Sequence, residues 1–171
     1  MDLKTWMAST PISSHMQREL YENEDVYVVK ENDTFSTINN KILDPRNKRK
    51  ATVMVDRYSR VTGLIRSIDL VNFFSAQYEN LVKEGGLSKL NSMTAREITE
   101  LREKAVSSYP FPSFPCVHSD DTVEDALIEM KRRKEFKSHP SKDVVIIGEN
   151  GEFYGFLTRM DILRESFNYM F

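Results

Sequence analysis

The chain of 171 residues is long enough for one domain or two small ones, and its 40% hydrophobic and 29% charged residues are typical of a globular protein with a solvated surface. A net charge of −2 gives no overall attraction to nucleic acid or anionic membranes, and no apolar run reaches the ~18–20 residues of a membrane span. The single cysteine, Cys116, excludes an internal disulfide framework and favours a reducing compartment, so we expect a cytoplasmic protein without membrane insertion.

The first half of the chain predicts a β-α-β-β-α order of elements. Residues 26–29 form an apolar run that predicts a buried strand. A short helix should follow, with Asp33 or Thr34 as its N-cap. Its apolar positions at helical spacing are Phe35, Ile38 and Ile42. A strand at 52–55, a second strand and a helix over 67–78 complete this unit.

The glycine pair within residues 83–86 is the clearest break in the sequence. It predicts a first repeat with an N-terminal extension at residues 1–84, a helical connector at 85–113 and a second repeat at 114–171. Within the connector, apolar spacing predicts a helix over 94–106.

The second repeat shows the same order of elements as the first. Residues 115–118 predict a strand, and a helix follows. The apolar stripe of that helix is Val123, Ala126, Leu127 and Met130. Strands at 144–147 and 152–157 flank Asn150-Gly151, a dipeptide that favours a hairpin turn. A final helix is predicted after the second of these strands.

One short motif occurs twice in the chain. Gly63 to Asp69 and Gly155 to Asp161 share their glycine and aspartate spacing and lie 92 residues apart (63 to 155 and 69 to 161). A repeat of this length predicts a duplicated small domain. In the second copy, Thr158 is the expected N-cap of the final helix and Asp161 completes a capping box. The first copy has Arg66 in place of the threonine, so we expect that capping alone does not account for its aspartate.

These features resemble the cystathionine-β-synthase (CBS) domain family, in the tandem arrangement known as a Bateman module, over about residues 26–79 and 114–167. The resemblance implies an α+β fold of two β-α-β-β-α repeats packed by pseudo-twofold symmetry. It also implies a regulatory, energy-sensing module that binds AMP, ADP, ATP or S-adenosylmethionine in the cleft between the repeats and signals to a partner protein by a conformational shift. The nucleotide would be a regulatory ligand, and no other cofactor is required.

Carried onto this sequence, the resemblance places phosphate at Thr158 and ribose at Asp161. A carboxylate can accept both ribose hydroxyls, and a helix N-terminus suits an anion. The residues expected near the base are Cys116, Val117, Asp143 and Val144 in the second copy, and Thr52 and Tyr27 in the first. In the first copy Asp69 would take the ribose, and Arg66 either pairs with phosphate or fills the pocket. We favour the second copy as the working site.

Other functional classes receive less support from the sequence. The three histidines have no metal-ligand spacing, and neither a nucleophile elbow nor a glycine-rich phosphate loop occurs, so we expect neither a metal site nor an enzyme. The basic runs at 46–50 and 131–134 are interpreted as solvated helix ends that complement the helix dipole, ahead of polyphosphate or nucleic-acid binding. Apolar helix faces favour a homodimer, and the alternative function is a ligand-free dimerisation or docking module for a transporter, channel or enzyme.

Overall fold

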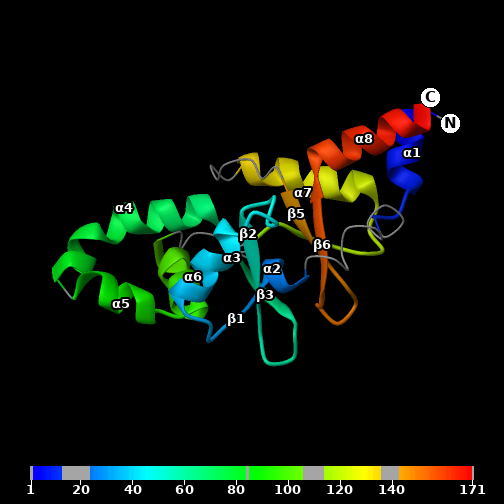
Figure 1. Ribbon diagram of the computed structural model, residues 1–171. Coiled ribbons are helices and arrows are strands. Elements are labelled where there is room, and N and C mark those ends of the chain that lie inside the picture. Colours follow the sequence, from blue (N-terminus) through cyan, green and yellow to red (C-terminus); the bar gives the residue numbers. More distant parts are fainter. Residues whose placement is uncertain (1, 13–23, 84, 106–113, 136–142, 171) are drawn as a thin grey trace. The chain divides into compact units, whose positions relative to one another are not determined.

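The computed structural model describes residues 2–12, 24–83, 85–105, 114–135 and 143–170 (Figure 1). These residues belong to two compact units. One unit is Asn23–Ser113, and the other combines Met1–Glu22 with Phe114–Phe171. Within the described ranges, no helix is both long and apolar enough to cross a membrane.

The unit Asn23–Ser113 is built around a three-stranded sheet. Its elements in chain order are α2 (Glu24–Tyr27), β1 (Val28–Lys30), α3 (Phe35–Leu43), β2 (Ala51–Val55), β3 (Val61–Arg66), α4 (Ser67–Lys83), α5 (Gly86–Ser92) and α6 (Ala95–Ala105). The strand order is β1-β2-β3, with β1 parallel to β2 and β2 antiparallel to β3. The helices bury their apolar faces against one face of this sheet.

The second unit repeats this arrangement. Its elements are α1 (Leu3–Ser9), β4 (Cys116–His118), α7 (Val123–Glu135), β5 (Asp143–Ile147), β6 (Phe153–Thr158) and α8 (Arg159–Met170). The order β4-β5-β6 and the strand directions match those of the first sheet. Even the irregularity agrees, because the register shifts at Met54/Val55 in one hairpin and at Ile146/Ile147, 92 residues later, in the other. The predicted α+β fold of two similar repeats is therefore confirmed.

The predicted helical stripes form the cores of the two units. In α3 the buried positions are Phe35, Ile38 and Ile42, as expected. In α7 the buried positions are Val123, Ala126 and Met130. The strand predicted at residues 26–29 is different, because Val26 and Tyr27 belong to α2 and β1 begins at Val28. The ladder of β1 with β2 begins at the pair Val28 with Val53, although β2 itself begins at Ala51, because the backbone of residues 24–27 is helical.

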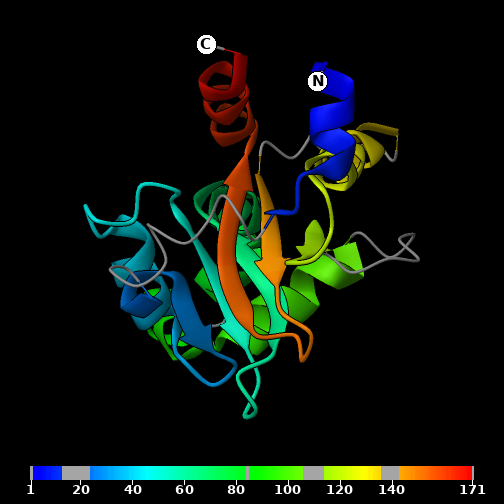
Figure 2. The same ribbon diagram turned by 90° about the vertical axis from the view of Figure 1, so that its right-hand side faces the viewer.

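The N-terminal segment, which we assigned to the first repeat, lies with the second. Trp6 and Ile12 are buried in the core of the unit that contains β4–β6. The Ile12 N–H donates to the Asp121 carbonyl at 2.9 Å, and the Val123 N–H donates to the Thr10 carbonyl at 3.1 Å. Figures 1 and 2 show α1 beside α7, and the two helices are in contact. Apolar residues of the N-terminal segment, Trp6 in α1 and Ile12 after it, therefore complete a core whose other members are distant in sequence.

The predicted connector at 85–113 shows the converse arrangement. Leu90, Ala95 and Ile98 of α5 and α6 are buried in the core of the unit that contains β1–β3. An isolated bridge joins Thr34 to Thr94, as another joins Pro11 to Thr122 in the other unit. The start of α3 at Thr34 is thus bridged to the segment that precedes the second copy. The start of α7 at Thr122 is bridged to the segment that precedes the first copy. The described part of the connector contributes to a core, and residues 106–113 lie outside the described residues.

Candidate functional site

The two glycine-to-aspartate motifs occupy the same place in their units, where the last strand of the sheet turns into a helix. Both glycines are buried, and each has its own requirement. A Cβ at Gly63 would lie 3.1 Å from the Met54 methyl carbon Cε on the neighbouring strand. Gly155 has a φ of 150°, which side chains rarely allow. Glycine is therefore required in the first copy by the close approach of Met54, and in the second copy by the backbone angle of Gly155.

In the second copy, Thr158 and Asp161 form the predicted capping box at the start of α8. The Thr158 N–H and hydroxyl donate to Asp161 Oδ2 at 2.8 and 2.7 Å. The Asp161 N–H donates in return to Thr158 Oγ1 at 3.0 Å. Thr158 is buried and Asp161 is half-buried. The box holds a carboxylate and a hydroxyl side by side at a helix N-terminus, where the helix dipole favours negative charge.

In the first copy, Arg66 forms three bonds with Asp69. Its backbone N–H donates to Asp69 Oδ2 at 3.0 Å, so the helix start keeps this capping bond although the threonine is missing. The guanidinium Nε donates to Oδ2 and Nη2 donates to Oδ1, both at 3.0 Å. Capping together with a bidentate ion pair therefore accounts for the aspartate that the sequence left unexplained.

Three of the predicted wall residues have their side chains in the cores of the units. Val117 and Val144 belong to the buried cluster around β4–β6. Thr52 is fully buried and pairs in register with Ile65, which belongs to the cluster around β1–β3. Among the described residues, no partner lies within hydrogen-bond distance of Thr52 Oγ1. These side chains shape the sheet beneath a site and do not reach an open surface.

The other predicted residues of the second copy share the opposite face of the sheet. Asp143 and Thr158 pair in register across the β5–β6 hairpin. Because side chains alternate along a strand, Cys116, Asp143 and Thr158 lie on the face that Val144 does not use. Cys116 and Asp143 are both half-buried. The structure thus places a thiol, a carboxylate and a hydroxyl on one face of this sheet, and the Thr158 hydroxyl also bonds the Asp161 carboxylate.

Tyr27, predicted near the base in the first copy, is half-buried at the end of α2, one residue before β1. It belongs to the same unit as Thr52, Arg66 and Asp69.

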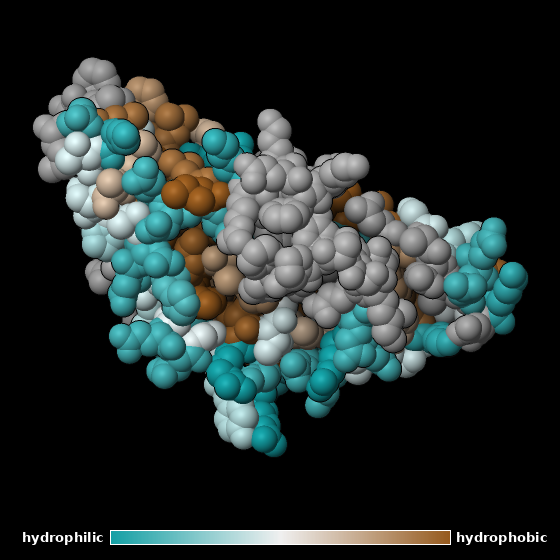
Figure 3. Space-filling view, turned by 180° about the vertical axis from the view of Figure 1, so that it is seen from behind, coloured by the Kyte–Doolittle hydropathy of each residue, from teal (hydrophilic) through white to brown (hydrophobic). Residues whose placement is uncertain are grey.

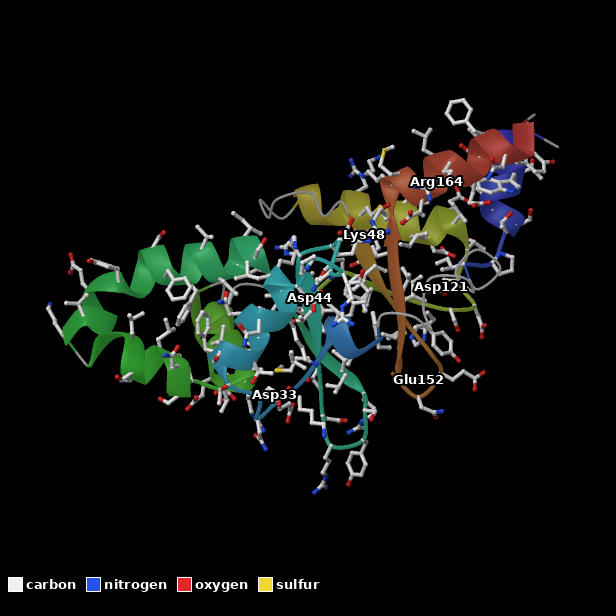
Figure 4. All side chains as sticks on the ribbon, viewed as in Figure 1. Asp33, Asp44, Lys48, Asp121, Glu152 and Arg164 are labelled. Carbon is white, nitrogen blue, oxygen red and sulfur yellow. The ribbon has the colours of Figure 1, made fainter. Side chains whose placement is uncertain are left out.

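Two members of the basic run at 46–50, Arg46 and Lys50, bond Asp44 at the start of the same loop. Arg46 donates from its backbone N–H and its guanidinium to Asp44, and this pair lowers the pKa of the Asp44 carboxyl to about 2. Lys50 Nζ donates to the Asp44 carbonyl at 3.2 Å, and Figure 4 shows Asp44 in this loop. Lys41, in the last turn of α3, donates to the Val28 carbonyl. These contacts support a structural role for the run. In the second basic run, the side chains of residues 132–134 lie outside the described part of the chain.

Figure 4 also labels Asp33 and Asp121, which have equivalent positions before α3 and α7. Asp33 accepts the Lys30 N–H at 2.8 Å, and Asp121 accepts the His118 N–H at 2.7 Å. Both carboxylates are therefore part of turns between strand and helix. Among the residues that the structure describes, no cluster of three or more His, Cys, Asp or Glu side chains is arranged to hold a metal ion.

Sequence reasoning missed two features of the sites. The fork between Arg66 and Asp69 depends on a side-chain conformation that spacing does not reveal. The pairing of Asp143 with Thr158 depends on the register shift at Ile146/Ile147, because the pair Ile147 and Phe153 beside the loop would otherwise place Asp143 opposite Leu157. The turn dipeptide indicates the hairpin, but it does not indicate this shift.

Comparison with known proteins identifies the fold. Residues 106–168 match the family model of the CBS domain. The structure of CBSX2, a CBS-pair protein from Arabidopsis thaliana, in complex with AMP has a TM-score of 0.63 at 15% identity, covering 95% of this chain and 99% of that chain. A CBS domain-containing protein of unknown function from Bacillus anthracis gives 0.62 at 15% identity, covering 98% and 99%. The CBS domain of a bacterial CNNM/CorC family Mg²⁺ transporter in complex with ATP gives 0.59 at 16%, covering 96% and 92%. No curated protein sequence matches the chain.

Proposed function

We propose that this chain, which matches the CBS domain model at residues 106–168 and has the fold of CBS-pair proteins, is a regulatory module that binds an adenosine-containing ligand. The candidate ligands are AMP, ADP, ATP and S-adenosylmethionine. The main observation in support of this proposal is the capping box of Thr158 and Asp161, which holds a carboxylate and a hydroxyl together at the N-terminus of α8. Two of the similar structures contain AMP or ATP, which supports this class of ligand.

The chemistry of the second copy suits a nucleoside phosphate. The Asp161 carboxylate would accept the two ribose hydroxyls, as acidic residues do in dinucleotide-binding folds. Thr158 and the first-turn N–H groups of α8 would receive the phosphate, because the helix dipole favours an anion there. Asp143, which pairs in register with Thr158, and Cys116 would border the base from the same face of the sheet. The ligand would thus contact three strands and one helix.

Binding would act on a partner protein by shifting populations. A ligand that prefers one arrangement of the two copies, or of two chains in a homodimer, stabilises that arrangement by its difference in affinity. The module needs no chemistry of its own for this, and we propose that it is not an enzyme. The partner would detect the stabilised arrangement.

A thermal-shift experiment with a matched pair of variants tests this proposal. At a ligand concentration about 100 times Kd, the native state gains ~2.7 kcal/mol. For a chain of this size, that gain raises Tm by roughly 5–10 °C. We expect such a shift with at least one of the four ligands, and we expect Asp161→Asn to abolish it. A Tm unchanged by all four ligands at millimolar concentration contradicts the proposal.

The matched control is Asp125→Asn at the start of α7. Asp125 forms the same kind of capping box with Thr122, accepting its N–H at 2.9 Å and its hydroxyl at 2.7 Å. Both substitutions remove a capping carboxylate, so they carry similar costs of ~1 kcal/mol in helix stability. Asp125→Asn should keep the ligand-induced shift. Equal loss of the shift in the two variants would mean that helix capping, and not contact with the ligand, is responsible.

A second candidate function is a ligand-free docking or dimerisation module. Along α8, Met160, Leu163 and Phe167 follow helical spacing and are 64%, 46% and 51% exposed. Figure 3 shows apolar residues reaching the surface among polar ones. Light scattering of Leu163→Glu tests this alternative, since a charge within an apolar interface should convert a dimer to a monomer. A dimer lost in this variant, combined with no ligand-induced shift in the native chain, favours the alternative.

A further inference from the structure

We propose that Arg66 prevents a nucleotide from binding at the first copy. Its guanidinium donates to both oxygens of the Asp69 carboxylate, where the two hydroxyls of a ribose would otherwise donate. This inference rests on the proposed function, because it assumes that the equivalent carboxylate of the second copy, Asp161, receives ribose hydroxyls. It predicts one nucleotide per chain, bound at the second copy. It also assigns the difference between the copies to the residue at position 66.

The geometry of the fork resembles that of a bound diol. Two neighbouring ribose hydroxyls present two parallel O–H donors to a carboxylate, and the guanidinium of Arg66 presents two parallel N–H donors. Nε reaches Asp69 Oδ2 and Nη2 reaches Oδ1, both at 3.0 Å. In the second copy, the bonds between Thr158 and Asp161 use Oδ2 alone. Arg66 therefore donates to Oδ1 of its aspartate, whereas Thr158 donates only to Oδ2 of its own.

The short chain connection between Arg66 and Asp69 makes the guanidinium hard to displace from the carboxylate. Arg66 and Asp69 are three residues apart at a strand-to-helix junction, so the guanidinium reaches the carboxylate at a high effective concentration. The Asp69 side chain is 12% exposed, which strengthens the charge-assisted fork relative to a fully solvated pair. A ribose would have to replace two donors on a positively charged guanidinium with two uncharged hydroxyl donors. This exchange disfavours binding at the first copy.

The phosphate position of the first copy is altered as well. Arg66 removes the hydroxyl that Thr158 supplies in the second copy. The Arg66 N–H donates to Asp69 at 3.0 Å, as the Thr158 N–H donates to Asp161 at 2.8 Å, so this backbone bond is common to both copies. The difference between the two positions is the side chain. An incoming phosphate at the first copy would therefore lack the O–H donor that Thr158 offers at the second.

Exchanging the two residues tests the inference. AMP binding is measured by isothermal titration calorimetry on the full chain, for the native protein, Arg66→Thr, Thr158→Arg and the double exchange. We expect one AMP per chain in the native protein, two in Arg66→Thr, none in Thr158→Arg and one in the double exchange. In the double exchange, a further Asp69→Asn substitution should abolish binding, whereas Asp161→Asn should leave it intact.

Two controls separate a specific effect from loss of folding or charge. Arg96→Thr removes an arginine whose Nε donates to Glu100 on the same helix at 3.1 Å, and it should leave one site. Arg66→Ser repeats the test with a second capping residue, and circular dichroism melting identifies any variant that does not fold. Either folded variant at position 66 is sufficient, because threonine and serine both allow a capping box.

The outcomes distinguish the inference from the proposed function. One site in both the native protein and Arg66→Thr overturns the inference alone. Two sites in the native protein also overturn it, because Arg66 would then admit the nucleotide. No site in the native protein but one in Arg66→Thr contradicts the proposed function of the second copy and supports the closure of the first. No site in either protein, for AMP or for ADP, ATP and S-adenosylmethionine titrated in the same way, overturns both.

Discussion

The isolated hydroxyl of Thr52 gives a sharp test of the core of the first unit. Thr52 is fully buried in β2, and no described residue offers a partner to its Oγ1. A buried hydroxyl without a hydrogen bond costs ~1–3 kcal/mol. Valine has nearly the same shape and replaces the hydroxyl with a methyl group. The second copy already carries a valine, Val144, at the equivalent position, where it is fully buried. We therefore expect Thr52→Val to raise the free energy of unfolding by about 1–2 kcal/mol.

Thr99→Val provides the comparison that isolates this effect. Thr99 is 4% exposed in the same unit, but its hydroxyl donates to the Ala95 carbonyl at 2.9 Å. Removing a satisfied hydroxyl should lower stability by ~1 kcal/mol, so the two substitutions should act in opposite directions. The midpoint of urea unfolding measures both, and the gain for Thr52→Val corresponds to roughly 2–8 °C in Tm. A lower midpoint for Thr52→Val, or an equal change in both variants, would refute the reasoning. AMP affinity should remain unchanged in Thr52→Val, because the side chain lies within the core.

Three further predictions concern the loop after α3, the second motif and the N-terminal helix. The pKa of Asp44 is lowered to about 2, so its contribution to stability is present above about pH 4 and is lost as the pH falls through 2. Urea midpoints from pH 2 to 5 should rise less steeply in Asp44→Asn, and an unchanged slope contradicts this. Gly155→Ala forces a side chain to a φ of 150° and should destabilise the protein by ~1–3 kcal/mol in urea unfolding, whereas an unchanged midpoint argues against strain. Trp6→Ala removes a side chain that is 6% exposed and should cost about 3–5 kcal/mol. Hydrogen exchange should then accelerate in β4–β6, and faster exchange in β1–β3 alone would oppose the assignment of α1.

Local features of the fold were accessible from the sequence, and long-range ones were not. The stripe at Phe35, Ile38 and Ile42 predicts α3 because helical spacing depends only on neighbouring residues. The capping box at Thr158 follows from a three-residue pattern for the same reason. The placement of Trp6 beside α7 depends on which core has room for it, and spacing carries no such information. Tyr27 belongs to the helix α2 despite its apolar run, and β1 begins one residue later, a boundary that apolar residues alone do not specify.

The comparison of the two copies shows why one residue can separate their roles without disturbing the fold. The N–H groups of residues 66 and 158 both donate to the aspartate three residues later, at 3.0 and 2.8 Å. This bond starts the following helix whatever side chain stands at the position. The side chain alone decides whether the carboxylate is forked by a guanidinium or lies in a capping box. An exchange at position 66 or 158 should therefore change nucleotide stoichiometry by a whole site while the circular dichroism spectrum of the native chain is retained. A variant that gains or loses a site only together with a loss of helix signal would show that backbone order, and not the side chain, controls the site.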